Sequence, residues 1–380
     1  IKAQELILAL LKERAETGRV YLMNIDHCNS HSSFIDKVEM SNLCQEITLP
    51  TVPIEHIDGN GEIALCILSA INVGQLKDLD ELEPLCDIAV RALDEIIDHQ
   101  KYPIDAAEKS TKARRSLGIG YIGLAHYLAK KGYKYDQKLA WRQVDKLTEA
   151  FQYYLLCASN DLAKEKGPCS AFKSTKYSDG ILPIDTYKKD VDELVNKREL
   201  TYDWEWLRKE IKEHGLRHST LSAQMPSESS SVVSNATNGI EPPRDYLSVK
   251  KSKKGPLKQI VPEYNKLKNF YTLLWDMKGN EGYINIVAVM QKYFDQAISG
   301  NWSYNPENYD VNEVPVSTMA QDFLTTYKYG WKTSYYQNTY DVKTDEVFEE
   351  PASVQSKDAI RLESLVEDLS NPEECESCAI

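Results

Sequence analysis

SNLCQEITLP, residues 41–50, places an amide, a thiol and a carboxylate at alternate positions, as Asn42, Cys44 and Glu46. If the segment is extended, alternate side chains project to the same side, so the three groups share one face. There the amide can orient a hydroxyl group, the carboxylate can accept a proton, and the thiol can act as a nucleophile, a reductant or a hydrogen-atom carrier. A buried cysteine between two exposed polar neighbours is the plainer alternative.

The composition excludes several classes of protein. The chain has 380 residues, of which 42% are hydrophobic and 27% charged, enough to bury a large core. Its formal net charge of -13 argues against binding nucleic acid, because phosphate contacts need clustered Lys and Arg. No apolar run reaches the roughly 18 residues of a membrane span, and no signal peptide is evident. The eight cysteines are mostly scattered, so we expect a cytoplasmic protein with free thiols and no membrane contact.

Strand patterns alternating with longer helical patterns predict an α/β fold. Short apolar runs predict strands at residues 19–25 and 62–73, the second buried on both faces, and a hairpin is expected over 246–262. Apolar spacing predicts helices over residues 2–17, 79–99, 121–132, 136–166, 203–214, 262–277, 284–298 and 315–329.

The last forty residues differ in character from the rest. Residues 341–380 contain twelve acidic and three basic residues, which predicts an ordered domain over 1–340 followed by a flexible acidic tail. The tail carries Cys375 and Cys378 in a C-x-x-C pattern. Zinc would need two more ligands, and the HCNSH segment (residues 27–31) is interpreted as a loop with incidental ligands, so no metal site is expected. A mobile dithiol suits thiol–disulfide exchange.

A serine-rich stretch, MPSESSSVVSNATNGIEPP, occupies residues 225–243. Ser227 to Ser231 precede an apolar stretch and can lie at a helix N-terminus, where free N–H groups favour an anion such as phosphate. An ordinary N-cap in a serine-rich loop explains the same pattern.

Gly118, Gly120 and Gly123 form a literal G-x-G-x-x-G pattern. A dinucleotide-binding fingerprint should follow a strand and precede an acidic residue that ends a second strand. Here both flanks have helical patterns, so close helix packing is the favoured interpretation. Further along the chain Tyr335 and Tyr336 are adjacent, which is typical of strands and interfaces but also permits stepwise transfer of an electron and a proton.

Together these motifs resemble the C-terminal half of the large, catalytic subunit of class I ribonucleotide reductase. The segments SNLCQEI, GEIALCILSAIN, MPSESSSVVSNATNGIEPPR and YYQNT and the terminal cysteine pair occur in that family's order and approximate spacing. The resemblance implies the C-terminal part of a ten-stranded α/β barrel, which is built from two antiparallel five-stranded halves. A finger loop, many helices and a flexible tail complete the expected fold.

The resemblance also implies roles for the residues around the thiol. Cys44 matches the finger-loop cysteine that becomes a thiyl radical and removes the 3′ hydrogen of a ribonucleotide. Glu46 matches the carboxylate that accepts the 3′-hydroxyl proton, and Asn42 the amide that holds substrate hydroxyls. Cys66 matches one of two cysteines that reduce the 2′ position and end as a disulfide.

Further roles follow from the same resemblance. Tyr336 and then Tyr335 match the relay that passes the radical inward to the finger-loop cysteine, and Cys375 and Cys378 match the pair that reduces the internal disulfide again. In that family the substrate diphosphate is held at the positions that match Ser227, Glu228, Ser229 and Ser230.

The implied partners are a ribonucleoside diphosphate, a small radical-generating subunit that contains metal, and thioredoxin or glutaredoxin. The helix expected over Val316–Lys332 resembles the surface that receives the small subunit's C-terminal tail. The chain itself is expected to bind no cofactor directly, with nucleotide effectors bound mainly by the N-terminal part.

One departure limits the expected activity of the chain. No residue before Cys44 matches the second internal redox cysteine, because Cys28 is too close in sequence and follows the wrong strand. The chain also opens with Ile1 inside a helical pattern. We therefore expect that turnover requires an N-terminal half, separate or missing. Two alternatives are an assembly subunit without activity, which the full set of motif residues argues against, and an NAD-dependent oxidoreductase built on Gly118–Gly123.

Overall fold

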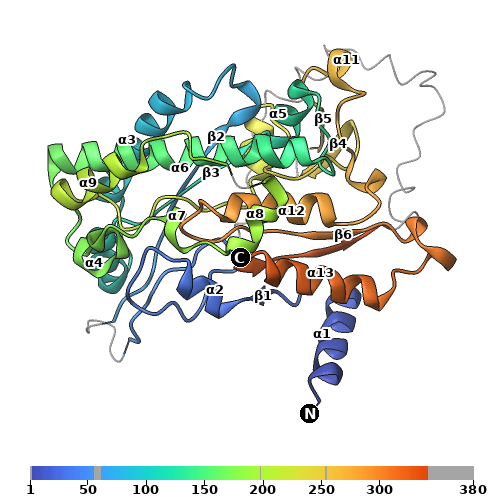
Figure 1. The fold of residues 1–380 in the computed structure, drawn as a ribbon, viewed down its shortest axis with the longest axis horizontal. Helices are drawn as coiled ribbons and strands as arrows, with labels where there is room; N and C mark the ends of the chain where they lie inside the picture. The colour runs from blue at the N-terminus through green and yellow to red at the C-terminus, as the bar shows by residue number, and fades with distance from the viewer. Residues whose placement is uncertain (1, 55–60, 197, 253–254, 341–380) are drawn as a thin grey trace.

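The computed structural model describes residues 2–54, 61–196, 198–252 and 255–340 (Figure 1). The α-helices are α1 (Ala3–Thr17), α2 (Ile25–Ser30), α3 (Leu82–His99), α4 (Asp105–Arg114), α5 (Leu124–Lys131), α6 (Lys138–Lys166), α7 (Pro183–Thr186), α8 (Asp192–Val195), α9 (Trp204–His214), α10 (Glu228–Val233), α11 (Tyr264–Leu267), α12 (Glu281–Gln291) and α13 (Val316–Lys328). The strands are β1 (Leu22–Met23), β2 (Ile67–Asn72), β3 (Leu117–Ile122), β4 (Leu247–Ser252), β5 (Gly255–Ile260), β6 (Trp302–Tyr304), β7 (Thr333–Ser334) and β8 (Gln337–Thr339). The protein is therefore a helix-rich α/β fold, as the sequence predicts.

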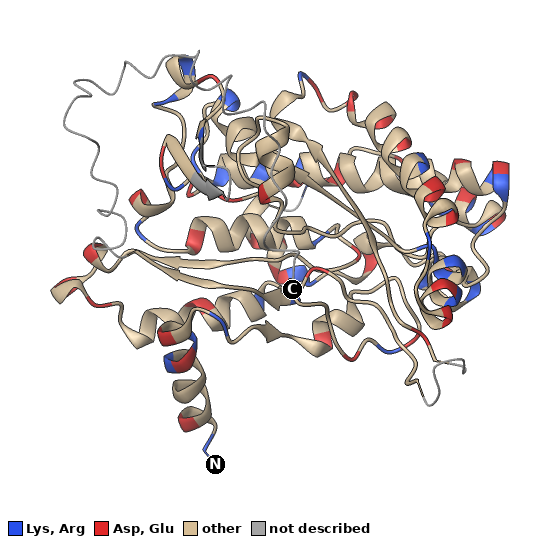
Figure 2. Ribbon diagram, turned by 180° about the vertical axis from the view of Figure 1, so that it is seen from behind, with Lys and Arg blue, Asp and Glu red and all other residues tan. Residues whose placement is uncertain are grey.

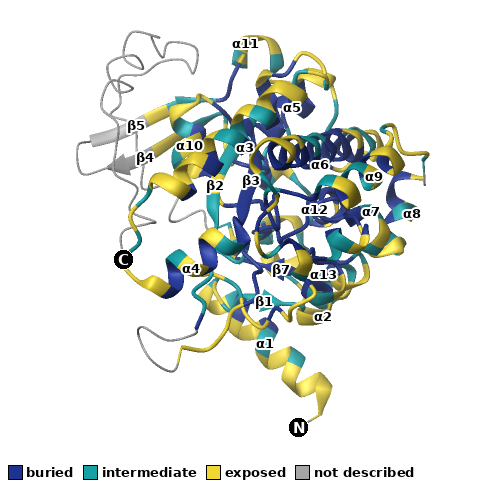
Figure 3. Cartoon of the chain, turned by 90° about the vertical axis from the view of Figure 1, so that its left-hand side faces the viewer, coloured by how far each residue is buried: buried dark blue, intermediate teal, exposed yellow. Residues whose placement is uncertain are grey.

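Helix α6 is the centre of the helical layer, with α3 and α12 packed against it (Figure 1). On α3, Cys86, Val90, Leu93 and Ile97 recur every three or four residues and are all buried, which is the stripe that an amphipathic helix turns toward a core. Figure 3 shows α6 and β3 largely buried, whereas α1 projects from the body and is mostly exposed. The apolar spacing of the sequence thus sets which helix faces inward.

The strands form a set of short pairs joined by irregular segments. β2 and β3 are parallel. β3 also pairs with residues 220–224, where Ile119 N donates to Leu221 O (2.8 Å). That segment pairs with residues 297–300, because Gln224 N donates to Ala297 O (3.1 Å). The other pairs are β1 with β7 and β4 with β5, both antiparallel, and β6 with β8, which is parallel. The described residues show no closed sheet.

The predicted strand over residues 62–73 is shorter and more exposed than expected. Only Ile67–Asn72 form β2, and of these Ile71 is buried while Leu68 keeps 42% of its surface exposed. The reason is that β2 has only β3 beside it among the described residues, so one edge and much of one face lack a neighbour. Burial on both faces, which the apolar run predicted, is therefore wrong for the chain in this structure.

The predicted helix over residues 121–132 begins only at Leu124, because the glycine pattern lies inside β3. A Cβ atom on Gly118 would lie 2.6 Å from Leu68 Cδ2, and one on Gly120 would lie 2.7 Å from Ala223 O. The glycines thus permit close approach of neighbouring strand segments, and the prediction of helix packing is wrong. Gly118 and Gly120 also lie within a strand rather than after it, and only Gly123 follows it, which is not the geometry of a dinucleotide fingerprint.

The helix expected over residues 262–277 is also interrupted. It is replaced by α11 and by a single 3-10 turn at Leu274–Asp276. Tyr271 explains the break, because its buried hydroxyl donates to Pro262 O (2.7 Å) and folds the segment back on itself. Helical spacing of apolar residues could not reveal this tertiary contact.

Helix α12 ends at Gln291, seven residues before the predicted end at residue 298. The side chain of Gln291 donates to the carbonyl oxygens of Phe294 (3.1 Å) and Gln296 (2.9 Å), which turns the chain out of the helix. The residues that leave the helix become part of the site described below.

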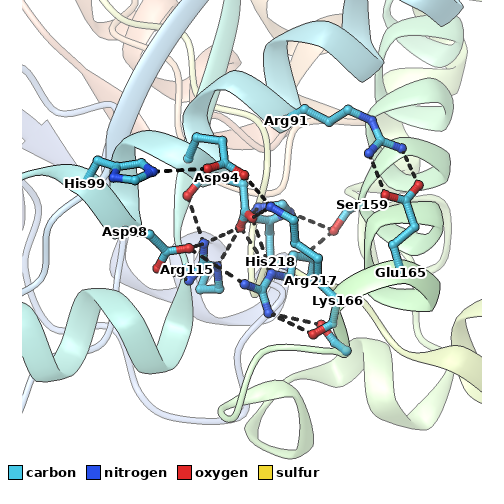
Figure 4. A network of polar contacts seen from close by, with 12 residues as sticks. Arg91, Asp94, Asp98, His99, Arg115, Ser159, Glu165, Lys166, Arg217 and His218 are labelled. Atoms are coloured by element: carbon cyan, nitrogen blue, oxygen red, sulfur yellow. Dashed lines mark hydrogen bonds and ion pairs between the residues drawn. The ribbon is translucent and has the colours of Figure 1, made fainter.

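Charge is placed mainly on the outer helices, while the segments that cross the middle of the molecule are mostly uncharged (Figure 2). A buried exception joins α3 to the segment before β3 (Figure 4). There Asp94, which is fully buried, accepts from Arg115 Nε (2.6 Å), His218 Nε2 (3.2 Å) and Arg217 Nε (3.2 Å), and Lys166 Nζ lies 3.4 Å from its other oxygen. We call these five residues the Asp94 cluster. No helix among the described residues is long and apolar enough to span a membrane.

Candidate active site

The segment with Asn42, Cys44 and Glu46 is a turn and not a strand. Gln45 N donates to Asn42 O (3.2 Å), Gln45 has a positive φ of 70°, and Asn42 Oδ1 accepts from Ile47 N (3.1 Å). The prediction that an extended backbone places the three side chains on one face is therefore wrong. The turn, closed by the amide of Asn42, brings that amide into contact with the Glu46 carboxylate instead.

Glu46 is buried at 2% exposure, and its carboxylate lies 3.4 Å from Ser299 Oγ. Burial raises the pKa of Glu46, and the contacts with Asn42 and Ser299 lower it only partly. Ser299 Oγ also donates to the carbonyl oxygen of Cys44 (2.5 Å). One hydroxyl thus ties the backbone at the thiol to a carboxylate that is a stronger base than an exposed glutamate.

Residues 294–299, which follow the end of α12, form hydrogen bonds with this turn and the residues after it. Ala297 N donates to Glu46 O (3.0 Å), and Gln296 Oε1 accepts from Thr48 N (3.3 Å). The same segment is fixed by Lys332, which is fully buried and donates from Nζ to Asp295 O and Gln296 O at 2.8 Å each. The turn is therefore held against the strand segments by backbone and amide groups.

Cys66 lies immediately before β2 and is close to the turn. Its Sγ accepts from Gln296 Nε2 at 3.4 Å, and a Cβ on Gly118 would lie only 2.9 Å from it. Burial raises the pKa of Cys66 strongly, and the negative charges of Glu46 and Asp295 raise it further. Cys66 is consequently a protonated thiol at neutral pH.

Tyr335 and Tyr336 connect the turn to the surface. Tyr335 is buried and its hydroxyl donates to Cys44 Sγ (3.6 Å), while its ring centroid lies 4.2 Å from that of Tyr336, which is 37% exposed. Tyr21 packs against both rings at centroid distances of 4.6 and 5.3 Å. Burial is the main cause that raises the pKa of Tyr335, whereas hydrogen bonding to Tyr21 lowers the pKa of Tyr336. The three rings form one aromatic cluster between solvent, at Tyr336, and the thiol of Cys44, at Tyr335.

Helix α1 fixes the backbone of Tyr336, the outermost tyrosine of this aromatic cluster. Arg14 is fully buried, donates to Val20 O (2.7 Å) and Tyr336 O (3.2 Å), and stacks over the ring of Trp302 at 4.6 Å. Gly18 O accepts from Gln337 N (2.9 Å). The first helix therefore holds the backbone that carries the outer tyrosine.

The serine-rich segment borders a large cavity. Ser227 occupies the N-cap position of α10 but its hydroxyl donates to Met225 O (3.0 Å) rather than to the helix. A cavity of about 640 Å³ lies beside it, lined among others by Glu228, Ser231 and Tyr336. The hydroxyl of Ser227 is thus turned to the backbone, while the neighbouring residues of α10 face open space.

Comparisons with known proteins show the family of this chain. The family model described as "Ribonucleotide reductase, barrel domain" matches residues 1–337. The chain belongs to the ribonucleotide reductase family. It is 56% identical over 349 residues to the ribonucleoside-diphosphate reductase subunit alpha of Haemophilus influenzae, covering 91% of this chain and 46% of that protein. Ribonucleoside-diphosphate reductase 1 subunit alpha of Escherichia coli K12 is 55% identical with the same coverage, and subunit alpha of Enterobacteria phage T4 is 42% identical, covering 90% of this chain and 45% of that protein. The chain spans about half the length of the curated relatives it matches.

Two further predictions for this ribonucleotide reductase chain concern the terminal cysteine pair and residues 27–31. Cys375 and Cys378 lie outside the described residues. The segment at residues 27–31 belongs to α2 and its end rather than to a loop, and its side chains are used structurally: His27 Nδ1 donates to Trp331 O (2.9 Å) and Cys28 Sγ to Lys332 O (3.7 Å). These contacts fasten α2 to the segment before the tyrosines.

Sequence reasoning missed Tyr21, Gln296 and Ser299, all of which contact the predicted site residues. Tyr21 stands alone in an apolar run, Gln296 falls in the segment 284–298 that was predicted to be helical, and Ser299 follows that segment directly. For Gln296 the available signal was a polar residue within an apolar helix pattern, at a position where a helix would bury it without a partner. Tertiary contacts, not spacing, identify these three residues.

Proposed function

We propose that this chain carries the radical-bearing part of an enzyme that reduces ribonucleoside diphosphates to 2′-deoxyribonucleoside diphosphates. One observation carries the proposal: the rings of Tyr336 and Tyr335 lie 4.2 Å apart and the Tyr335 hydroxyl lies 3.6 Å from Cys44 Sγ. Such contacts allow an electron and a proton to pass in short steps from an exposed phenol to a thiol. Ordinary packing would not require the inner hydroxyl to face a sulfur atom.

In the proposed reaction, the thiyl radical of Cys44 removes the 3′ hydrogen of the sugar, because the S–H bond formed is comparable in strength to the C–H bond broken. Glu46, whose pKa is raised by burial, accepts the proton of the 3′ hydroxyl. Asn42 holds the substrate hydroxyls. Cys66 and a second cysteine supply two electrons and two protons, so that the 2′ hydroxyl leaves as water and the thiols become a disulfide.

We further propose that the second cysteine and the remaining strands come from an N-terminal half that is separate or missing here. The exposed face of β2, together with a chain that covers 46% of its relatives, supports this arrangement. The complete fold would be the ten-stranded barrel with two antiparallel five-stranded halves. Residues 1–340 would form its C-terminal part, and 341–380 a flexible tail.

The substrate diphosphate is proposed to bind at Ser227–Ser230, beside the cavity that borders α10. Cys375 and Cys378 are proposed to reduce the internal disulfide and then to be reduced by thioredoxin or glutaredoxin. A small subunit that contains metal would supply the radical, with its C-terminal tail bound along α13. Nucleotide effectors would bind mainly on the N-terminal half, and no cofactor would bind this chain directly.

The test combines this chain with an N-terminal half taken from an alpha subunit relative and with a small subunit. Deoxynucleotide formation is measured for the unchanged chain, Cys44→Ser, Tyr335→Phe and Tyr336→Phe. Each variant should lose more than about 99% of turnover, since each step of the path depends on its own O–H or S–H group. Tyr133→Phe, at a partly buried tyrosine of the main core, is the control that should retain turnover. Full activity of Cys44→Ser would refute the proposal.

A further inference from the structure

Gln296 is a fully buried amide whose nitrogen contacts the sulfur of Cys66. Its Nε2 lies 3.4 Å from Cys66 Sγ and 2.9 Å from Leu117 O, and its Oε1 accepts from Thr48 N at 3.3 Å. The side chain therefore bridges the turn that carries Cys44, strand β3 and the reducing thiol. Nothing in the proposed chemistry has so far used this amide.

The two backbone partners fix the orientation of the Gln296 amide. A backbone carbonyl such as that of Leu117 can only accept, and a backbone N–H such as that of Thr48 can only donate. Exchanging the nitrogen and oxygen of the amide would therefore break both contacts. With one N–H committed to Leu117, the other N–H is the one directed at Cys66 Sγ.

The surroundings of Gln296 keep this donor in place. Its backbone N donates to Ser222 O (3.0 Å), and its backbone O accepts from Lys332 Nζ (2.8 Å) and Gln291 Nε2 (2.9 Å). On the other side of the sulfur, the absence of a Cβ on Gly118 leaves the space that Cys66 occupies. The donor and the sulfur are thus both held by fixed backbone.

We propose that Gln296 is a positioning residue for Cys66, holding its sulfur and stabilising negative charge on it whenever the S–S bond formed in turnover is cut. This proposal rests on the proposed function, in which Cys66 forms a disulfide. In that step a thiolate of an external dithiol attacks the partner sulfur, the S–S bond breaks, and Cys66 leaves with the electron pair. Cys66 then takes a proton, and the second thiol of the dithiol displaces the partner sulfur, so that one disulfide is exchanged for another.

The charges around Cys66 explain why a neutral donor matters. Burial, Glu46 and Asp295 all disfavour its thiolate, and the Gln296 hydrogen bond is the contact that favours it. A cation there would ionise the thiol at rest. An amide lowers the cost of the transient anion while leaving the resting thiol protonated.

The experiment measures alkylation of Cys66 by iodoacetamide in the 380-residue chain, which needs no turnover. Mass spectrometry follows the rate between about pH 7 and pH 10, around the ordinary thiol pKa. The variants are Gln296→Met, which removes the amide, and Gln296→Glu, which keeps the acceptor for Thr48 N but lacks the donor. Each should slow Cys66 alkylation about tenfold at every pH, equivalent to one unit of thiol pKa.

Internal references separate this effect from altered folding. Cys157, partly buried on α6, supplies the reference rate, and the fully buried Cys86 reacts only if the chain unfolds. Gln224→Met is the matched control, because Gln224 is an equally buried amide that bonds the backbone of Tyr121. It should leave the ratio of Cys66 to Cys157 rates unchanged.

An unchanged ratio in both Gln296 variants, or an equal fall in Gln224→Met, would overturn the proposal. If Cys86 reacts in Gln296→Met, that variant has unfolded. The result for Gln296→Glu, which preserves the side-chain volume, then decides the test. Failure of the proposed function would show differently: Cys66→Ser would then leave ribonucleotide reduction intact, whatever the alkylation rates.

Discussion

Around Asp94 a buried carboxylate is bound by cationic side chains, whereas the side-chain hydrogen bonds around Cys44 and Cys66 come from amides and hydroxyls. In the Asp94 cluster, burial would raise the pKa of the carboxyl, but His218 and Arg115 outweigh it and hold that pKa well below its usual range. Near the thiols, Asn42, Gln296 and Ser299 supply the hydrogen bonds. The difference follows from chemistry: a neighbouring cation ionises a thiol, and a thiol that must give hydrogen has to keep its proton.

The largest effect is expected from removing the charge at the centre of the Asp94 cluster. Asp94→Asn removes the one fully buried carboxylate that Arg115, Arg217 and Lys166 share, and leaves them only the more exposed Asp98 and Glu95. This loss should cost about 3–5 kcal/mol of unfolding free energy. Urea unfolding measures the loss. Asp87→Asn, on the same helix but in an exposed pair with Arg91, should cost less than about 1 kcal/mol. Equal losses in the two variants would show that burial of the cluster has no special role.

His218 gives this cluster a pH dependence. Burial lowers the pKa of His218 to about 4, while the unfolded chain takes up its proton near pH 6.5. Between these values the unfolded state binds more protons, so stability is complete above about pH 6.5 and falls as the pH decreases toward 4. His218→Asn should remove up to about 3 kcal/mol of that decrease. Unfolding curves of both proteins across this window provide the measurement, and identical slopes would contradict the assignment.

Gly118→Ala tests the thiol region by volume rather than charge. The added Cβ would lie 2.6 Å from Leu68 Cδ2 and 2.9 Å from Cys66 Sγ, so the thiol must move. We expect a loss of about 1–3 kcal/mol and a changed rate of Cys66 alkylation. Gly279→Ala is the control, because its Cβ would meet only Tyr309 Oη at 3.8 Å. Normal stability and reactivity in Gly118→Ala would mean that the space beside the sulfur is not needed.

The smallest effect on stability is expected at Ser299. Ser299→Ala removes one hydroxyl that contacts both the Cys44 carbonyl and Glu46, which should cost about 1 kcal/mol. Because this hydroxyl lowers the pKa of Glu46, its loss should raise that pKa and move the acidic limb of the pH–rate profile to higher pH. The reconstituted enzyme supplies the profile. A shift to lower pH would exclude Glu46 as the base.

The sequence predicted those parts of the fold that local pattern controls. Helices α3, α6, α9 and α13 lie within three residues of their predicted bounds, because each has an apolar stripe and a clear end signal. The hairpin of β4 and β5 was predicted by the same reasoning. Elements that depend on distant partners were not: β3 looked helical, and α12 ends where Gln291 turns the chain.

The site divides in the same way. Spacing singled out Asn42, Cys44 and Glu46 as a candidate group, and the resemblance alone implied their roles. The extended backbone assumed for them is wrong, since the segment forms a turn. The contact of Tyr335 with Cys44 spans 291 positions of sequence, and only the motif resemblance predicted it. Gln296 could not be predicted, because its role depends on contacts with Thr48 N, Leu117 O and Cys66 Sγ, which are all distant in sequence.

The hydrogen bonds between α1 and the backbone of the outer tyrosine have a practical consequence. Arg14 and Gly18 hold the backbone of Tyr336 and Gln337, so strain applied to α1 reaches the tyrosine that we propose as the entry point of the radical. A purification tag or fused domain placed rigidly against this helix would disturb the backbone of Tyr336 without touching Cys44. Spectroscopic labels should therefore be placed elsewhere in the protein or attached through a long, flexible linker.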